Sequence, residues 1–354
     1  MSNASKMTAT EFLQAQLSRR RLLRTAAAAG AAGAALPGSL RWRAAAAQAD
    51  KPLTIAFSVP GLNFPFFVHM MDLAEQHAAE LGNITFVPLD GQQNGAPSST
   101  KQSADLEAQV ANKVDGIVIS PNDGVALAES VQAAIDAGIP VVTVDRTVND
   151  VATLAHVGAD NVRGGEIQGE YVISLLLDGG DIFELQGQPG ATPAIDRHAG
   201  LEAAIATQDA VKIVQSQTAE FAREKAVSVM EGLLAANEPP AAVVCANDDM
   251  AFGVAQVVED NDLTIPIIGF DALPEALQSI QSGALAATIE QFPGQQASTA
   301  LDILVAFLRE GTEVTEHDTY LEPLLVNADN LAAAERAVEA GVAPGGTPVA
   351  TPAS

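Results

Sequence analysis

An aspartate and an arginine stand side by side at the end of a short β-branched run, where they could bind a polar molecule. The run is Pro-Val-Val-Thr-Val at residues 140–144, and Asp145 and Arg146 follow it directly. Such a run favours a buried strand, and ligands of open α/β sheets bind outside the carboxyl ends of the strands. Asp145 offers acceptors and Arg146 offers donors, which suits a ligand rich in hydroxyl groups. A surface ion pair would look the same in sequence.

Other predicted strands end in side chains of similar chemistry. Phenylalanines follow two of them, although aromatic residues make up only 4% of the chain, and polar groups follow the others. Phenyl rings pack on the C–H faces of a sugar, while planar polar groups share its hydroxyls. The pattern predicts a cavity for a small, uncharged polyhydroxy ligand. Besides Asp145 and Arg146, the predicted ligand-binding residues are Phe64, Phe66, Phe67, Arg197, Phe221, Asn247, Asp271 and Gln291. The same strand ends also carry Asn122, Asp123, Arg223 and Asp248, which are not among the predicted ligand-binding residues.

Each of these residues also has an ordinary structural role open to it. Phe66 and Phe67 could form the core face of a helix. Asn247 and Asp271 could be turn or cap residues, and Arg197 could neutralise an acidic surface. We favour the binding interpretation because so many strand ends carry such groups in one chain.

The elements that must position these residues alternate between strand and helix. Short β-branched runs alternate with Ala-rich stretches from residue 53 onward, which predicts βαβ units and parallel sheets. The series is too long for one sheet and divides into two similar halves near residues 158–161, after a strand-like run at 153–157. The predicted strands are 53–59, 84–89, 116–120, 140–144, 181–185, 211–215, 241–246, 266–270 and 286–290. The predicted helices are 66–81, 98–113, 124–137, 161–177, 193–207, 221–236, 249–260 and 273–282.

Some acidic residues have a purely structural prediction. A carboxylate at a helix start accepts hydrogen bonds from free amides. Asp248 and Asp249 are predicted to do this for a helix that opens at Met250. Asp160 is predicted to do the same for the helix at 161–177. An aspartate is therefore not by itself a sign of function.

The first 49 residues have the pattern of a targeting segment. Residues 18–24, Ser-Arg-Arg-Arg-Leu-Leu-Arg, resemble the twin-arginine export motif. The Ala- and Gly-rich residues 25–40 are too short and weakly apolar for a membrane span, and Ala-Gln-Ala at 47–49 offers a cleavage site. A basic N-terminal tail is the alternative. We expect an export signal over residues 1–49 and a mature protein in the periplasm or on the extracellular face of the cytoplasmic membrane.

The remainder of the chain is strongly acidic. Residues 1–49 hold seven basic side chains and one acidic one, which leaves 11 basic and 43 acidic for residues 50–354, a formal charge of −32. That charge repels phosphate backbones and argues against nucleic-acid binding. Cys245 is the single cysteine, so no intramolecular disulfide can form and no lipobox cysteine follows the signal. Residues 343–354, rich in Pro, Gly and Thr, are expected to form a flexible tail.

Several segments, in collinear order, resemble the periplasmic sugar-binding proteins of ABC importers, which have the type I periplasmic binding protein fold. The resemblance is to the ribose-binding-like branch and spans about residues 53–326. Asn-Phe-Pro-Phe-Phe at 63–67 is similar to that branch's Asn-Asn-Pro-Phe-Phe turn, and Val-Asp-Arg at 144–146 to its Leu-Asp-Arg. The other matching segments are 158–165, 184–187, 197–201, 246–251, 269–271 and 286–291.

The resemblance implies an α/β fold of two similar, doubly wound parallel-sheet lobes with flavodoxin-like strand order. It also implies a three-crossing hinge and a ligand held in the cleft between the lobes. The first lobe would take residues 50–159 and 292–320, and the second residues 160–291 and 321–342.

The resemblance also implies a role for each site residue. Phe66 and Phe221 would sandwich the sugar ring, Phe67 would complete the wall, and the polar site residues would hydrogen-bond the hydroxyls. Where ribose binders place a Ser and a second Asn, this chain has Pro60 and Phe64. The first-lobe end of the pocket should therefore be more apolar, which favours a deoxysugar, another pentose or hexose, or a cyclitol over ribose.

The function implied is capture of a monosaccharide or cyclitol by a monomer that delivers it to an ABC permease, with no cofactor, metal or catalysis. A sugar sensor that presents its ligand to a chemoreceptor is one alternative. A glycoside-processing enzyme with Asp145 and Asp271 as its carboxylate pair is a less favoured one. A regulator of the lactose-repressor type should begin with a basic helix-turn-helix, and this chain begins with the export pattern instead.

Overall fold

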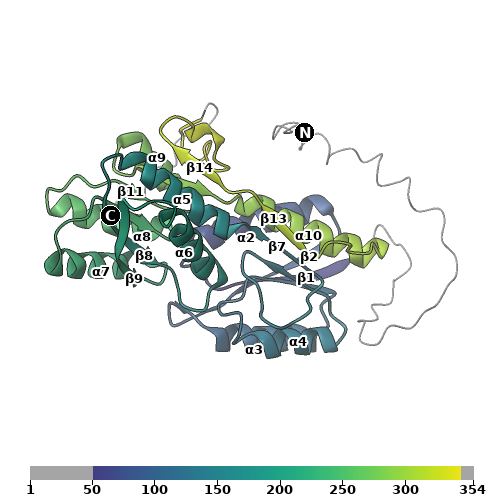
Figure 1. The fold of residues 1–354 in the computed structure, drawn as a ribbon. Helices are drawn as coiled ribbons and strands as arrows, with labels where there is room; N and C mark the ends of the chain where they lie inside the picture. Colours follow the sequence, from purple (N-terminus) through teal and green to yellow (C-terminus); the bar gives the residue numbers. More distant parts are fainter. Residues whose placement is uncertain (1–50, 344–354) are drawn as a thin grey trace, which may run out of the picture. The chain divides into compact units, whose positions relative to one another are not determined.

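Two six-stranded sheets organise residues 51–343, the part of the chain that the computed structural model describes (Figure 1). The first sheet consists, in spatial order, of β2 (Ile84–Asp90), β1 (Leu53–Val59), β5 (Gly116–Ile119), β6 (Val141–Val144), β7 (Ala155–Ala159) and β13 (Asp318–Leu321). The second consists of β9 (Val211–Thr218), β8 (Gly180–Gln186), β10 (Ala242–Cys245), β11 (Ile267–Ile268), β12 (Ala287–Glu290) and β14 (Leu324–Asn327).

The two sheets repeat one topology. Without its last strand, each sheet has the order 2-1-3-4-5, which is the flavodoxin-like doubly wound order. Neighbouring strands are parallel throughout, except that β14 runs antiparallel to β12. The central strands β5 and β6 are buried at every position because helices cover both faces of the sheet. The predicted α/β fold with two similar parallel-sheet lobes is confirmed.

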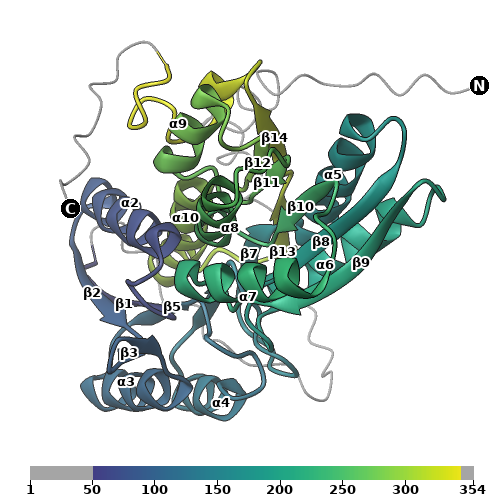
Figure 2. The same cartoon turned by 90° about the vertical axis from the view of Figure 1, so that its left-hand side faces the viewer.

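Helices lie on both faces of each sheet. In the first lobe, α2 (Pro65–Leu81) and α10 (Pro293–Glu310) pack together on one face, and α3 (Ser99–Asn112) and α4 (Ala128–Asp136) on the other (Figure 2). In the second lobe, the packed pairs are α5 (Asn161–Leu175) with α6 (Thr192–Ile205), and α7 (Arg223–Ala236) with α8 (Asp248–Asp260). Helix α9 (Pro274–Ser282) packs beside β12.

The chain passes between the two lobes three times. The passages lie between β7 and α5, between β12 and α10, and between β13 and β14. This is the three-crossing arrangement that the resemblance implies. The finer lobe bounds stay a prediction, and the expected export signal and C-terminal tail lie outside the described residues, apart from Ala343.

Several elements were not predicted. They are the start of α10, the strands β13 and β14, the short hairpin of β3 (Gln92–Gln93) and β4 (Ala96–Pro97), and the 3₁₀ turn η2 (Leu331–Ala333). The C-terminal end of α10 does agree with the helical pattern that precedes Gly311 in the sequence, and Gly311 is its C-cap. The start of α10, Pro293-Gly294, looks like a helix breaker in sequence, although proline is well tolerated in a first turn. The carboxylate of Glu335, far along the chain, accepts the free amides of Gly294 and Gln295 at 2.9 and 3.1 Å. A distant residue therefore supplies the cap.

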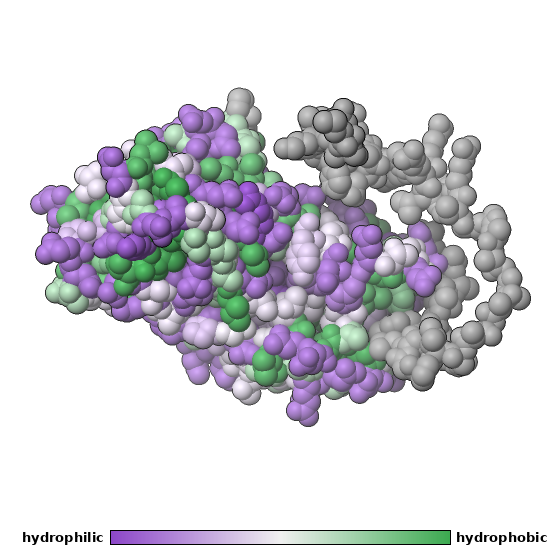
Figure 3. All heavy atoms as spheres, viewed as in Figure 1, coloured by the Kyte–Doolittle hydropathy of each residue, from purple (hydrophilic) through white to green (hydrophobic). Residues whose placement is uncertain are grey.

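The surface agrees with the charge of the chain. In Figure 3, hydrophilic side chains spread across the visible face, and apolar side chains form separate patches among them. Among residues 51–343, no helix is long and apolar enough to cross a membrane.

Candidate ligand-binding site

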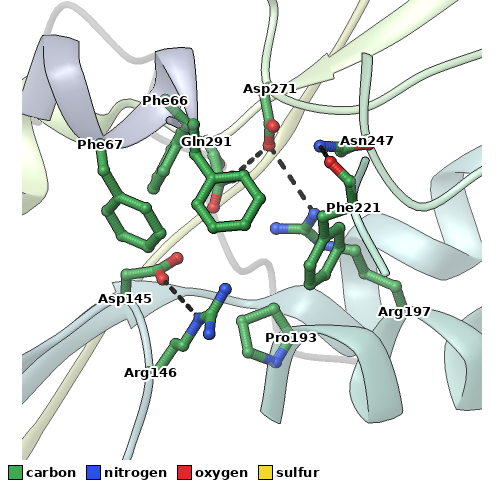
Figure 4. A pocket seen from close by; sticks show the side chains of 11 residues that line it. Phe66, Phe67, Asp145, Arg146, Pro193, Arg197, Phe221, Asn247, Asp271 and Gln291 are labelled. Atoms are coloured by element: carbon green, nitrogen blue, oxygen red, sulfur yellow. Dashed lines mark hydrogen bonds and ion pairs between the residues drawn. The ribbon is translucent and has the colours of Figure 1, made fainter. Parts of the chain in front are cut away.

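A pocket lies where the carboxyl ends of strands from both sheets meet. It has an empty volume of about 330 Å³, its open side included, which is at the small end of the range for ligand sites. All ten residues predicted from the sequence line it, together with Pro193 (Figure 4). Their role in holding a ligand stays a prediction, but the structure does bring them to one place.

Most of these side chains reach the pocket from the end of a strand or the start of a helix. Phe64 is the N-cap of α2, and Phe66 and Phe67 lie in its first turn. The remaining residues follow strands or lie at or near the start of a helix. Figure 4 shows Phe66 and Phe67 facing Arg197 and Phe221 across the pocket. Asp145 and Arg146 follow β6, Pro193 and Arg197 lie on α6, Phe221 precedes α7, Asn247 caps α8, Asp271 follows β11, and Gln291 follows β12.

Three of these residues have a strained backbone. Asp145, Phe221 and Asp271 have φ of 61°, 61° and 108°, in the region that favours glycine. Such conformations cost on the order of 1–3 kcal/mol each and tend to cluster at functional sites. Gly187 packs against the ring of Phe221 so closely that a Cβ at this position would overlap the ring. The fold therefore holds these side chains in place at a cost in free energy.

Contacts with four residues hold the guanidinium group of Arg197 in place. Its Nε donates to Asn161 Oδ1 at 2.8 Å, and one terminal nitrogen donates to the carbonyl oxygen of Ala246 at 2.6 Å. Its guanidinium carbon lies 3.6 Å from the centre of the Phe270 ring and one nitrogen lies 3.7 Å from Asp271 Oδ1. These contacts position the guanidinium before any ligand arrives.

Arg146 keeps an unused donor. One terminal nitrogen donates to the carbonyl oxygen of Asn122 at 3.1 Å. Its Nε lies 3.6 Å from Asp145 Oδ2 and has no hydrogen-bond partner, although it is buried. Gln291 shows the converse, because its Nε2 donates to Asp271 Oδ1 at 2.6 Å while its buried Oε1 has no partner.

These two atoms point to the chemistry of a ligand. Among the described residues, four buried side-chain nitrogen or oxygen atoms lack a partner, and two of the four belong to this pocket. An unpaired buried polar atom costs about 1–3 kcal/mol. One of the two atoms donates and the other accepts, and a hydroxyl group can satisfy either.

The prediction about the cap of α8 was wrong. The helix begins at Asp248, and its cap is Asn247, whose side-chain oxygen accepts from the amide of Met250 at 3.0 Å. Asp248 is fully buried and instead accepts from the amide of Leu273 at 2.9 Å and from Thr288 Oγ1 at 2.8 Å. The predicted cap at Asp160 is confirmed by a 2.9 Å bond from the amide of Arg163.

Asn247 therefore combines its structural role with a place in the pocket. Its oxygen is used by the cap, and its Nδ2 donates to the carbonyl oxygen of Phe221 at 3.3 Å. The group that it can still offer a ligand is its second N–H. Phe66 and Phe67 likewise have both roles, since they belong to the hydrophobic core and line the pocket.

Burial shapes the protonation of the four charged groups. It raises the pKa of Asp271 to about 7, against the lowering effects of Arg197 and Gln291. It also raises the pKa of Asp145, which Arg146 and Arg197 lower. Burial lowers the pKa of Arg146 to about 10 and lowers that of Arg197. Two carboxylates facing two guanidinium groups balance in charge when all are ionised, so the pocket suits an uncharged ligand.

Three of the four phenylalanines that line the pocket, Phe64, Phe66 and Phe67, form its first-lobe wall. The ring centres of Phe64 and Phe67 lie 6.1 Å apart and those of Phe66 and Phe67 5.1 Å apart, both edge to face. Pro60, which the sequence also placed at this end, is buried but does not line the pocket. The apolar character of this end therefore comes from Phe64.

The sequence reasoning missed Pro193. It has no side-chain hydrogen-bonding group, so a search for polar ligands passes over it. It lies in the first turn of α6, four residues before Arg197 and thus on the same helix face. That spacing was the signal that could have found it. Among residues 51–343, no group of three or more His, Cys, Asp and Glu side chains is placed to hold a metal ion.

Comparison with known proteins identifies the family. The periplasmic binding protein domain matches residues 55–313. The ribose import binding protein of Salmonella typhimurium is 34% identical over 251 residues, covering 71% of this chain and 83% of that protein. The Bacillus subtilis ribose import binding protein is 36% identical over 255 residues, covering 71% and 81%.

Solved structures agree with the sequence relatives. The Caulobacter myo-inositol binding protein, solved with myo-inositol, has a TM-score of 0.75 and 33% identity, and the alignment covers 81% of this chain and 97% of that one. A solute-binding protein of an ABC transporter from Bacillus halodurans, also solved with myo-inositol, has a TM-score of 0.74 and 30% identity, with 79% and 96% covered. This chain therefore belongs to the periplasmic binding protein domain family, in its ribose-binding-like sugar-binding branch.

Proposed function

We propose that this protein is an extracytoplasmic solute-binding protein that captures one monosaccharide or cyclitol between its lobes and delivers it to an ABC importer. The observation that carries the proposal is the pocket itself. It joins phenyl rings to charge-balanced polar groups, and it leaves one buried donor, on Arg146, and one buried acceptor, on Gln291, without partners.

The polar groups of the pocket are of the kinds that bind a polyol. Only one oxygen of Asp271 takes part in the hydrogen bond from Gln291, and Asn247 retains one N–H. A ring with several hydroxyl groups can donate to the carboxylates and accept from the guanidinium and amide groups at once. Phe66, Phe67 and Phe221 offer the apolar surfaces for its C–H faces.

Phe64 narrows the choice of ligand. It lines the pocket with a ring that is 7% exposed, and it can neither donate nor accept a hydrogen bond. A hydroxyl pointed at this ring would lose its partner, so we favour a deoxysugar, a cyclitol, or a pentose or hexose that turns a C–H face toward it. Relatives named for ribose import and neighbours solved with myo-inositol or D-allose support this range of ligands.

Capture proceeds by closure of the lobes, without chemistry. The first lobe contributes Asp145 and Arg146, and the second contributes Arg197, Asn247 and Asp271, so a bound sugar contacts both lobes at once. A ligand with more contacts in the closed form shifts the protein toward that form. The permease then recognises the closed monomer, in the periplasm or on the extracellular face of the cytoplasmic membrane, and no cofactor or catalytic step is needed.

A thermal-shift panel on the full chain tests the proposal. The panel holds aldopentoses, aldohexoses, deoxysugars and cyclitols. In a separate assay, the aryl glycosides of the same sugars are incubated with the protein to detect hydrolysis. A ligand at a hundredfold excess over its Kd adds about 2.7 kcal/mol to stability. We expect a large shift for one or two compounds and no glycoside turnover.

Two variants make the panel specific to the pocket. Asp145→Asn should lose the shift, while Asp136→Asn, at the exposed end of α4, should keep it. No shift with any compound would contradict monosaccharide capture, and glycoside turnover would favour the enzyme.

A further inference from the structure

A hydrogen bond joins the two lobes beside the pocket. Gln188 follows β8 of the second sheet, and Asn122 follows β5 of the first. Gln188 Nε2 donates to Asn122 Oδ1 at 2.8 Å and lies 3.4 Å from the carbonyl oxygen of Asn122. Neither residue lines the pocket. We call this contact the inter-lobe bridge.

The inter-lobe bridge continues to Arg146. One terminal nitrogen of Arg146 donates to the carbonyl oxygen of Asn122 at 3.1 Å, and the same nitrogen lies 3.5 Å from Gln188 Oε1. Gln188 thus donates to one first-lobe residue and accepts from another with a single amide group, which a carboxylate or an ammonium group cannot do. The bridge therefore places the guanidinium of a pocket residue.

The loops on both sides are shaped for this contact. Gly190, two residues after Gln188, has a φ of 84°, and a Cβ at this position would lie 2.6 Å from Asp123 Oδ2. The amide of Thr147, next to Arg146, donates to Thr192 Oγ1 at 3.3 Å. Three hydrogen-bonded pairs thus join residues 187–192 of the second lobe to the strand ends of the first: Gln188 with Asn122, Gln188 with Arg146, and Thr192 with Thr147.

Water can reach the bridge from one side. Gln188 also lines a second cavity, with an empty volume of about 730 Å³, that lies between loops of both lobes and shares Phe64 with the pocket. Asn122, in contrast, is only 7% exposed. A bond with one buried partner and one partner beside a water-accessible cavity can open without unfolding either lobe.

We propose that Gln188 is a positioning residue that closes the lobes over the ligand, pairing with Asn122 and placing Arg146. This rests on the proposed function, because it assigns the closing contact of the same site. Opening of the lobes requires the inter-lobe bridge to break, so the bridge sets the lifetime of the bound state. It contributes little to the first encounter with the ligand.

The first test compares dissociation rates. In Gln188→Ala, the sugar found by the thermal-shift panel should dissociate about tenfold faster, as expected for the loss of hydrogen bonds across the lobes, with an association rate changed less than about twofold. Gln215→Ala is the matched control, since the side chain of Gln215 donates to Asn237 Oδ1 at 3.0 Å within its own lobe. A Gln188→Ala dissociation rate equal to that of Gln215→Ala would overturn the proposal.

The second test does not depend on a ligand. Nitroxide labels on Ala108→Cys and Ala203→Cys, exposed positions on α3 and α6, report the distance between the lobes, and the buried Cys245 stays unlabelled. We expect Gln188→Ala and Asn122→Ala to increase the population with long distances, and the double variant to increase it no further than either alone. Unchanged distances would overturn the bridge even if no sugar binds, whereas the absence of sugar binding with changed distances would contradict only the proposed function.

Discussion

The two arginines of the pocket differ in how firmly the fold holds them. Arg197, in the second lobe, uses Nε and a terminal nitrogen on fixed acceptors and stacks on Phe270. Arg146, in the first lobe, has an unpaired Nε and shares one terminal nitrogen between Asn122 and Gln188. Contacts within its own lobe therefore position Arg197, whereas Arg146 depends on the other lobe and retains a donor for a ligand.

This difference indicates which part of the site discriminates between ligands. A preformed wall contributes affinity without a cost of ordering, and an incomplete wall makes closure depend on the ligand. The first-lobe wall also holds Phe64, whose ring can neither donate nor accept a hydrogen bond. Substitutions in the second lobe should thus change stability and binding together, and those in the first lobe should change mainly binding.

The largest effect is expected for Arg197→Ala. The substitution removes both hydrogen bonds of Arg197 and leaves the buried carboxylate of Asp271 without the cation that α6 supplies. The free energy of unfolding should therefore fall by about 3–5 kcal/mol, and sugar binding should be lost. Urea denaturation and calorimetric titration measure the two effects. Arg163→Ala, which breaks ion pairs with Glu166 and Glu170 on the exposed side of α5, is the control and should cost less than about 1 kcal/mol. Equal losses of unfolding free energy in Arg197→Ala and Arg163→Ala would contradict the inference that the fold holds Arg197 firmly.

The next effect is a pH dependence that comes from Asp271. Burial raises its folded-state pKa from 3.8 to about 7, so the folded protein binds this proton more tightly than the unfolded chain does. The resulting stability is present below the unfolded pKa and is lost as the pH rises through 7, by a few kcal/mol at most. Asp271→Asn removes the titrating group and should flatten this part of the curve.

The measurement for Asp271 is the difference between two proteins. Urea unfolding of the wild type and of Asp271→Asn across this pH interval isolates its contribution, because Asp145, Asp248 and Glu290 also have raised pKa values and titrate in both. Parallel curves for the two proteins would show that Asp271 is ionised in the folded state like an ordinary carboxyl group.

A smaller loss of stability is expected for Arg146→Ala. The substitution breaks one firm hydrogen bond and removes the unpaired Nε. The buried Asp145 loses Arg146 but keeps Arg197 as a nearby cation, so the unfolding free energy should fall by only about 1–3 kcal/mol. Binding should still weaken by on the order of a hundredfold, because the ligand loses a charged donor. Denaturation and titration on the same sample give both values. A stability loss as large as that of Arg197→Ala would mean that the two walls are held equally firmly.

The smallest expected effect is a change of selectivity in Phe64→Asn. An amide here can pair with a hydroxyl that the phenyl ring cannot, so affinity should shift toward the more hydroxylated of two related sugars by about 1 kcal/mol, roughly fivefold. Titrations with a sugar and its deoxy analogue measure the ratio. Leu62→Asn, at a 38% exposed position two residues earlier, should leave the ratio unchanged. An unchanged ratio in Phe64→Asn would exclude Phe64 as a selectivity residue.

Local sequence determined most of the helices and strands, and the strand ends that line the pocket. β-Branched runs such as Val141–Val144 favour buried strands, and the polar residues that follow such strands lie at the carboxyl edge of a parallel sheet. For that reason, residues as distant as Phe64 and Gln291 could be assigned to one pocket, and the structure places both there. The identity of the ligand did not follow, because hydroxyl-binding groups are common to many sugars.

Only the tertiary structure decided how these groups share their hydrogen bonds. The cap of α8 by Asn247, the support of α10 by Glu335 and the pairing of Gln188 with Asn122 all depend on contacts that side-chain type does not specify. An amide or carboxylate has several possible partners within reach, and the choice among them is made by packing between distant segments. The sequence by itself therefore determined which residues gather at the site, and the fold decided which of their atoms remain free for a ligand.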